Sequence, residues 1–391
     1  MEQTSLHKAF RSLPDPCINR KKLHTFKFNY INAVIVFLLL LPACSDNKKT
    51  ELRDPYLQPF SSTSIWNTPI GSNAKYVHAQ IEPATEAGMT VDEDLIVMSP
   101  KEPLLDIYRS DASWDRTKDR CHIDGGLMFS APIPRSFFVS KDTWDGATPN
   151  SGLAVLMPDG HTVKQTQPFA KCDADKATSL FQFDDVDLYG DGTYGAHGGS
   201  QLSAIGGTLR SNELTPTSGP IKHVLKVNIF GRKNIYYDDE TKGYRWPAIH
   251  ADGYAAEQYY KDRTYPVVRE CRMGALLAIP AWMSIDSLKL ETEPARIIAQ
   301  ALQNYGAYLV DDTAWNVWAI VTDWTPEKRF INEFKKNWGF SFIENSLDTP
   351  WTRDMRRLFT NLYVVDNNTP QTIGGGGAPR IALAPPLQIK K

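Results

Sequence analysis

Three histidines lie beside glycine or aspartate, where a loop can present an imidazole to a ligand. They are His122 in "RCHIDGG", His197 in "YGAHGGSQ" and His250 in "PAIHADGY". Histidine titrates near neutral pH, and loops often carry catalytic residues. Tyr254 follows His250 by four positions, a spacing that puts both side chains on one side of a strand or a helical turn. These residue types predict acid–base chemistry, although glycine pairs can also mark only bulges or close strand crossings.

Arginine and aromatic side chains close to these histidines predict a binding surface for an acidic sugar. Arginine donates two parallel hydrogen bonds to a carboxylate, and aromatic faces suit sugar rings. The candidates for substrate binding are Tyr244, Arg245 and Trp246 in "GYRWPA", and Arg272 in "CRMGALLAIP".

Together these groups fit β-elimination on a uronic acid. The reaction needs a partner for the uronate carboxylate, a base at C5 and an acid at the leaving group on C4. A sugar as the leaving group makes the enzyme a polysaccharide lyase, and a hydroxyl makes it a dehydratase. We therefore expect His122, His197, His250 and Tyr254 to include the catalytic residues.

Motifs for other chemistries are missing from the sequence. It has no G-x-S-x-G elbow, phosphate-binding glycine loop, H-E-x-x-H helix or dinucleotide-binding glycine signature, and "DLYGDGTYG" lacks the glutamate that closes a calcium loop. We expect no metal and no cofactor. The formal net charge of −2 provides no basic field for nucleic acid, so an acidic oligo- or polysaccharide is the expected partner.

Two other function classes stay open. A glycoside hydrolase needs two carboxylates facing a cleft, and the available aspartates are Asp184, Asp185, Asp187, Asp311 and Asp312. Neighbouring aspartates in a strand point to opposite faces, so at most one of each adjacent pair faces a site. The second class is a non-catalytic glycan-binding protein, for which the 11% aromatic content and a membrane tether suffice.

Many short apolar or alternating runs between turn signals predict a mainly β fold with a β-sandwich or jelly-roll-like core. "MPDGH" marks a hairpin at Asp159 and Gly160, and Trp66 is expected to anchor an extended arm. Helical periodicity is confined to residues 293–306, 325–339 and 349–365, which predicts two or three peripheral helices.

The start of the chain carries a targeting signal rather than part of the fold. Basic residues precede the apolar run "INAVIVFLLLL", and "LPAC" ends at Cys44. This order predicts a lipoprotein signal peptide over 1–43, with Cys44 as the lipidated first residue. A polar tether over 44–58 then leads to a single β-rich domain over 59–391 with a glycine- and proline-rich tail. The expected location is the bacterial cell envelope, with the lipid as the only membrane contact.

Cysteine spacing in the remaining chain indicates neither a disulfide framework nor a zinc site. Cys121, Cys172 and Cys271 are widely separated and odd in number. One disulfide and one free thiol are possible in an oxidising compartment.

Six segments, in order, resemble a family of secreted bacterial β-proteins: "PFSSTSIWN", "HGGSQLSAIGGTLR", "PIKHVLKV", "GYRWPA", "RMGALLAIP" and "ALQNYGAYLVDDTA". The similarity extends from about Pro59 to Asp323. A lipid-anchored chain of this kind is similar to the oligosaccharide dehydratases that marine Bacteroidetes use on ulvan, a sulfated rhamnose–uronate polysaccharide. That resemblance implies removal of water from a terminal uronate to give a 4,5-unsaturated sugar. It assigns no catalytic residue.

Overall fold

A computed structural model describes residues 52–115, 117–139, 152–266 and 268–390. Strands hold 26% of the residues and helices 14%, so the predicted mainly β class is confirmed. Cys44, the signal peptide and the first part of the tether lie outside the described residues. None of the helices in the described ranges has the length and apolar content needed to cross a membrane.

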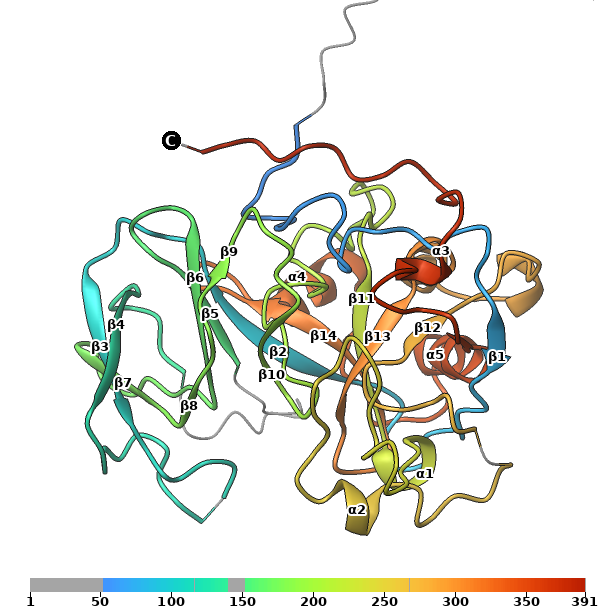
Figure 1. Ribbon diagram of the computed structural model, residues 1–391, viewed down its shortest axis with the longest axis horizontal. Helices are drawn as coiled ribbons and strands as arrows, with labels where there is room; N and C mark the ends of the chain where they lie inside the picture. Colours follow the sequence, from blue (N-terminus) through green and yellow to red (C-terminus); the bar gives the residue numbers. More distant parts are fainter. Residues whose placement is uncertain (1–51, 116, 140–151, 267, 391) are drawn as a thin grey trace, which may run out of the picture. The chain divides into compact units, whose positions relative to one another are not determined.

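Most strands form one mixed sheet that runs through the molecule (Figure 1). Its hydrogen-bonded order is β1 (Tyr76–His78), β15 (Tyr363–Val365), β12 (Leu276–Ala278), β13 (Ala307–Asp312), β11 (Leu225–Ile229), β14 (Trp318–Trp324), β2 (Thr90–Val97), β5 (Leu153–Leu156), β6 (Thr162–Gln167) and β8 (Phe181–Gln182), with β9 (Val186–Asp187) also pairing β6. The pairs β11–β13, β14–β2 and β2–β5 are parallel. Alternation along single strands did not predict these parallel pairs, and the sandwich or jelly-roll arrangement stays a prediction.

A smaller sheet contains β4 (Leu127–Pro132), β3 (Leu104–Arg109) and β7 (Lys176–Ser179). Cys121 and Cys172 form a disulfide beside it, across a sequence separation of 51 residues. Cys271 is a buried free thiol, so these three cysteines form one disulfide and leave one thiol, an arrangement that the sequence left open.

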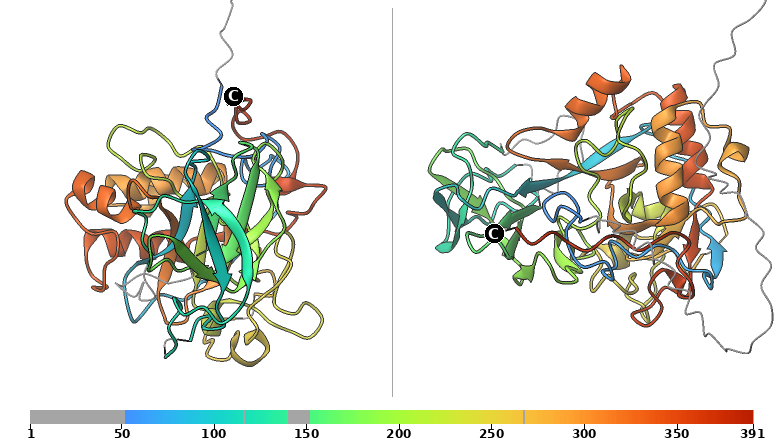
Figure 2. Two further views of the ribbon diagram at one scale, coloured as in Figure 1. Left: turned by 90° about the vertical axis from the view of Figure 1, so that its left-hand side faces the viewer. Right: turned by 90° about the horizontal axis from the view of Figure 1, so that it is seen from above.

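Three longer helices cover one face of the main sheet (Figure 2). They are α3 (Glu293–Asn304), α4 (Phe330–Trp338) and α5 (Pro350–Thr360), and each lies within a segment of predicted helical periodicity. Their apolar stripes pack in one core with strand residues such as Val227 and Ile320. The remaining short elements are β10 (Tyr194–His197), α1 (Gly231–Asn234), α2 (Ala255–Gln258), η1 (Ile285–Leu288) and η2 (Ile373–Gly375).

An arm over 52–74 and the loops around β10 pack against the opposite face of the sheet. Trp66 is 1% exposed, and its indole Nε1 donates a hydrogen bond to the Gly192 carbonyl over 2.8 Å. Its ring packs edge-on against Tyr308, in a core that also holds Ile205. The predicted anchor role of Trp66 is confirmed. Lys226 also lies on this face, with its Nζ 5.9 Å from the centroid of the Trp66 ring.

Candidate functional site

His197 ends β10 inside the protein, where its side chain is 1% exposed. Its Nδ1 lies 2.8 Å from the Asp94 carboxylate, and its Nε2 lies 3.3 Å from Asp92 Oδ2. Both aspartates belong to β2 and are two positions apart, so the strand presents them on one face. The imidazole therefore bridges two buried carboxylates. The sequence predicted instead that it lines an open cleft.

Lys226 on β11 completes this buried network. Its Nζ donates to Asp94 Oδ2 over 2.5 Å and to the Ser203 carbonyl over 2.7 Å. Burial and the Lys226 charge lower the pKa of His197, but Asp94 and Asp92 outweigh them and raise it to about 9. The Asp94 pKa is lowered, because Lys226 and His197 outweigh the effect of burial. Since burial is costly for unpaired charge, this balanced network fastens β10 to β2 and β11.

The glycine pair after His197 brings the backbone against carboxylates. Gly198 has a φ of +51°, and a Cβ there would lie 2.3 Å from the Asp311 carboxylate. A Cβ on Gly199 would lie 2.7 Å from Asp252, and the Gly199 amide donates to Asp311 Oδ1 over 2.9 Å. These glycines therefore let the backbone pass close to two carboxylate side chains of the protein itself, Asp311 and Asp252.

Asp252, Asp311 and Asp312, here named the carboxylate cluster, meet where β13 ends and the loop before α2 passes. The Tyr254 hydroxyl donates to Asp312 Oδ2 over 3.2 Å, and the Tyr259 hydroxyl donates to Asp252. Asp312 also accepts the Gly231 amide over 2.7 Å. Asp311 and Asp312 contact different segments of the chain, but both lie beside Asp252, whereas at most one of the pair was expected to face a site.

The pKa values of this cluster are shifted in the direction that favours the protonated forms. Burial, followed by the charge of Asp311, raises the pKa of Asp252 well above its ordinary value. Burial also raises the pKa of Asp312, against the hydrogen bonds that it accepts. Burial and the neighbouring carboxylates raise the pKa of the Tyr254 hydroxyl. The shifts favour the protonated forms of Asp252 and Tyr254, and the cluster has the raised pKa values that are common at functional sites.

The loop over 249–254 is the open side of the cluster. His250 is exposed, and Asp252 and Tyr254 are half-buried. The Ile249 amide donates to the Ser200 carbonyl over 3.3 Å, which ties this loop to the turn after His197. His250 and Tyr254 thus lie on one accessible segment. This segment adjoins the turn after His197, and the buried His197 holds that turn in position.

The predicted arginine clamp lies elsewhere. Arg245 pairs with Asp366 over 3.4 Å and donates to the Glu270 carbonyl. Burial and then the charge of Arg245 lower the pKa of Arg272. Across the described ranges, no hydrogen bond or ion pair joins either arginine to the carboxylate cluster. The prediction that they share a cleft with His197 and Tyr254 is therefore not supported by any contact.

The other predicted residues are spread over separate parts of the molecule. Tyr244 and Trp246 are half-buried and pack against different cores. His122 is exposed in the loop between β3 and β4, on the smaller sheet. Asp185, one of the alternative carboxylates, pairs with Lys164 over 2.7 Å and is exposed.

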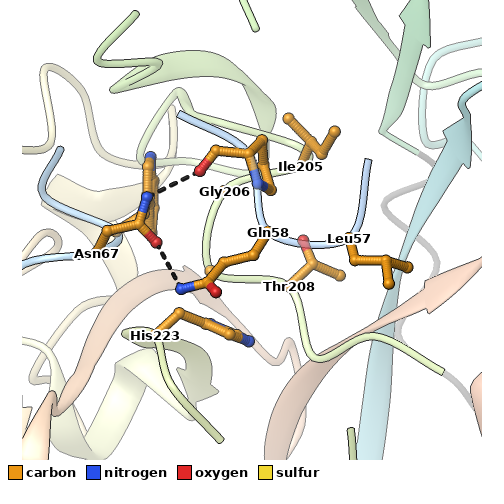
Figure 3. Close-up of a pocket in the computed structure, with 10 residues that line it drawn as sticks. Leu57, Gln58, Asn67, Ile205, Gly206, Thr208 and His223 are labelled. Atoms are coloured by element: carbon orange, nitrogen blue, oxygen red, sulfur yellow. Dashed lines mark hydrogen bonds between the residues drawn. The ribbon is translucent and has the colours of Figure 1, made fainter. Parts of the chain in front are cut away.

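A small pocket under the arm has Thr208 in its lining (Figure 3). The Thr208 hydroxyl donates to Asp94 of the buried network. Two of its lining residues, Gln58 and Asn67, are joined by a hydrogen bond of 3.1 Å that Gln58 donates, and a third, His223, pairs with Glu213 over 3.0 Å. Its volume of about 10 Å³ suits a single water and excludes a sugar.

Sequence reasoning did not single out Asp92, Asp94, Lys226 or Asp252 as candidate site residues. A signal for the first two exists in "TVDEDLIV", where acidic residues alternate inside an otherwise apolar strand. Because buried charges need partners, such a strand predicts cations opposite it. Asp252 stands in the polar run around His250, but only the tertiary contact with Asp311 distinguishes it.

Comparisons with known proteins found no matching family model, no matching curated protein and no matching solved structure. In the ranges that the structure describes, no group of three or more His, Cys, Asp or Glu side chains is arranged to hold a metal ion.

Proposed function

We propose that the protein is an enzyme that performs β-elimination on uronic-acid-containing oligosaccharides. A base removes the C5 proton beside the carboxylate, the C4–O bond breaks, and an acid protonates the departing oxygen. Water is released if O4 is a terminal hydroxyl, and a sugar is released if O4 is glycosidic. The product in both cases is a 4,5-unsaturated uronate.

The observation that carries this proposal is the placement of Asp252 and Tyr254 on one half-exposed loop, with pKa values raised in the direction that favours their protonated forms. A protonated Asp252 donates a hydrogen bond to the uronate carboxylate, which replaces the arginine clamp expected from the sequence. Tyr254 donates its proton to the departing oxygen. The exposed imidazole of His250 takes the C5 proton.

The buried residues act through this loop. Asp311 receives the Gly199 amide and raises the pKa of Asp252, while Asp312 holds the Tyr254 hydroxyl. His197 fixes the turn that carries Gly199, so it is a positioning residue. A carbohydrate enzyme with these features fits the bacterial cell envelope, anchored through a lipid on Cys44.

Glycoside hydrolysis is the second candidate, and one observation favours it. Burial and then the charge of Asp311 raise the pKa of Asp252, as expected for a general acid beside a second carboxylate. In that reaction Asp252 transfers its proton to the glycosidic oxygen, and Asp311 acts as the base or nucleophile.

Two substitutions test the proposal and separate it from hydrolysis. Tyr254→Phe removes the proposed proton donor and should lower kcat by about 10²–10⁴-fold. Asp252→Asn keeps a hydrogen-bond donor at the uronate carboxylate, so elimination should fall by less than about tenfold, whereas proton transfer in hydrolysis should fall by about 10²–10⁴-fold. His161→Ala, an exposed histidine away from the cluster, is the control. Wild-type rates for a folded Tyr254→Phe variant would overturn the assignment.

A further inference from the structure

An exposed group of aromatic rings lies at the β1 edge of the main sheet. Its rings come from β1, β15 and the loop after β12, whereas the carboxylate cluster lies at the end of β13. Trp282, in the loop between β12 and η1, is 67% exposed, the highest value among the large apolar side chains of the described residues. The centroid of its ring lies 5.0 Å from that of Tyr76 on β1 and 6.0 Å from that of Tyr363 on β15, and both pairs are edge to face. His78 packs on Tyr363 at 4.7 Å. We name these four residues the aromatic platform.

The platform is held in place despite its exposure. Two tyrosine rings fix the orientation of the indole, and those tyrosines belong to paired strands, with His78 opposite Tyr363 in the register. An exposed ring with few accessible orientations loses little entropy when a ligand stacks on it. Single exposed apolar residues need no explanation, but a rigid group of this kind marks a binding surface.

A cavity of about 420 Å³ opens beside the platform. It is lined by His78, Gln80, Ile81, Tyr265 and Thr360, so His78 belongs to both features. The Gln80 amide N–H donates to His78 Nδ1 over 3.0 Å, which leaves the other ring nitrogen to carry a proton. Burial lowers the pKa of His78, so the ring is neutral at neutral pH.

The walls of the cavity are fixed from behind. Arg263 donates to the Gln80 carbonyl over 3.1 Å and to the Lys233 and Pro266 carbonyls, which occupies its guanidinium. Glu82 accepts the Thr264 and Tyr265 amides. Gln80 has a φ of +48°, an uncommon conformation for a residue with a side chain. Strain of this kind persists where surrounding contacts impose it, and it is concentrated at functional positions.

The polar groups that line the cavity are an imidazole, an amide, a phenol and an aliphatic hydroxyl, all uncharged. Among the described residues, neither the side-chain amide of Gln80 nor the hydroxyl of Tyr265 makes a hydrogen bond to another protein group. Uncharged donors and acceptors beside a flat aromatic surface match a ligand that has hydroxyl groups and an apolar C–H face. None of the five described residues that line the cavity is a cation that would pair with a carboxylate or a sulfate.

From these contacts we propose that the aromatic platform and its cavity bind neutral pyranose residues, at a site separate from the carboxylate cluster. One sugar ring stacks on Trp282, and its neighbour in the chain places its hydroxyls at His78, Gln80 and Tyr265. The site holds a polysaccharide on the enzyme through its neutral sugars while uronates reach the cluster.

The test measures binding of the full-length, detergent-solubilised protein to an array of neutral and uronate-only oligosaccharides. The wild-type protein should bind neutral members, and Trp282→Ala should weaken that binding about tenfold or more, the usual effect of removing an aromatic hot spot. Trp114→Ala is the matched control, because Trp114 is an exposed tryptophan that stacks on Phe181 of β8, at the opposite end of the main sheet's strand order from β1.

Two further variants keep the outcome interpretable. Trp282→Phe retains a ring and should keep part of the affinity, while Tyr254→Phe should bind neutral sugars like the wild type, even if the proposed catalysis fails. The proposal is overturned if no neutral oligosaccharide binds, if only uronates bind, or if a folded Trp282→Ala variant binds as tightly as Trp114→Ala.

Discussion

Two buried aspartates on one strand, Asp92 and Asp94, determine what His197 can do. They hold the imidazole as a cation at neutral pH, with Lys226 as the second positive charge. A charged histidine with both nitrogens against carboxylates has no free base to offer a substrate. Its contribution is the position of the turn that follows it.

Replacing His197 should therefore destabilise the fold. His197→Ala leaves Asp92 and Asp94 with less compensation, and breaking a buried charge pair costs about 3–5 kcal/mol. Urea unfolding of the variant and of a His161→Ala control measures the difference. An unfolding free energy within about 0.5 kcal/mol of the control would show that the network contributes nothing.

The same substitution predicts a pH dependence with a defined sign. The folded-state pKa of His197, about 9, is above the ordinary histidine value of 6.5, so protonation favours the folded state. The stability advantage of the wild type over His197→Ala should be complete below about pH 6.5 and should decrease as the pH rises towards 9. An advantage that grows over this interval would contradict the proposed charge state.

Asp252 predicts a pH dependence of activity. Elimination needs the protonated carboxyl, so kcat/KM should fall as the pH rises through the raised pKa of Asp252. Asp252→Asn cannot lose that proton, and its profile should lack this alkaline decline. An unchanged decline in the variant would assign it to another group.

At the scale of elements, two glycine pairs determine how the segment after β10 packs. The first pair allows contact with the carboxylate cluster. The second pair, Gly206 and Gly207, lies against the Trp66 indole, where a Cβ would approach to 2.3 and 2.6 Å. These glycines are needed because the chain passes directly over other side chains.

Gly206→Ala should cost about 1–3 kcal/mol by forcing the Trp66 ring out of its packed position. Gly253→Ala is the matched control, because a Cβ there meets no atom within 4 Å. Thermal unfolding of both variants measures the difference. Equal melting temperatures would show that the arm adapts without cost.

Elements with a local signal could be predicted from the sequence. α3, α4 and α5 followed from apolar periodicity with proline at or near the start, and the β5–β6 hairpin followed from Asp159 and Gly160. The parallel strand pairs could not be predicted, since partners such as β2 and β14 are far apart in the chain. For the same reason His250 and Tyr254 were found locally, whereas the contact between Asp252 and Asp311 was not.

At the scale of the whole molecule, location depends on a segment outside the described residues. Cys44→Ala should release the protein from membranes, because the predicted signal ends in "LPAC" and provides the only expected anchor. Fractionation of cells that express the wild type or the variant measures this. A variant that stays with the membranes would place the anchor elsewhere.

The central claim is that the carboxylate cluster and the 249–254 loop eliminate across C4–C5 of a uronate. The most direct measurement is the ultraviolet absorbance of the unsaturated product during incubation with a panel of uronate-containing oligosaccharides, with wild type and Tyr254→Phe side by side. The predicted result is a rise with the wild type that is about 10²–10⁴-fold slower with the variant. New reducing ends without a rise in absorbance, or binding without any product, would contradict the claim.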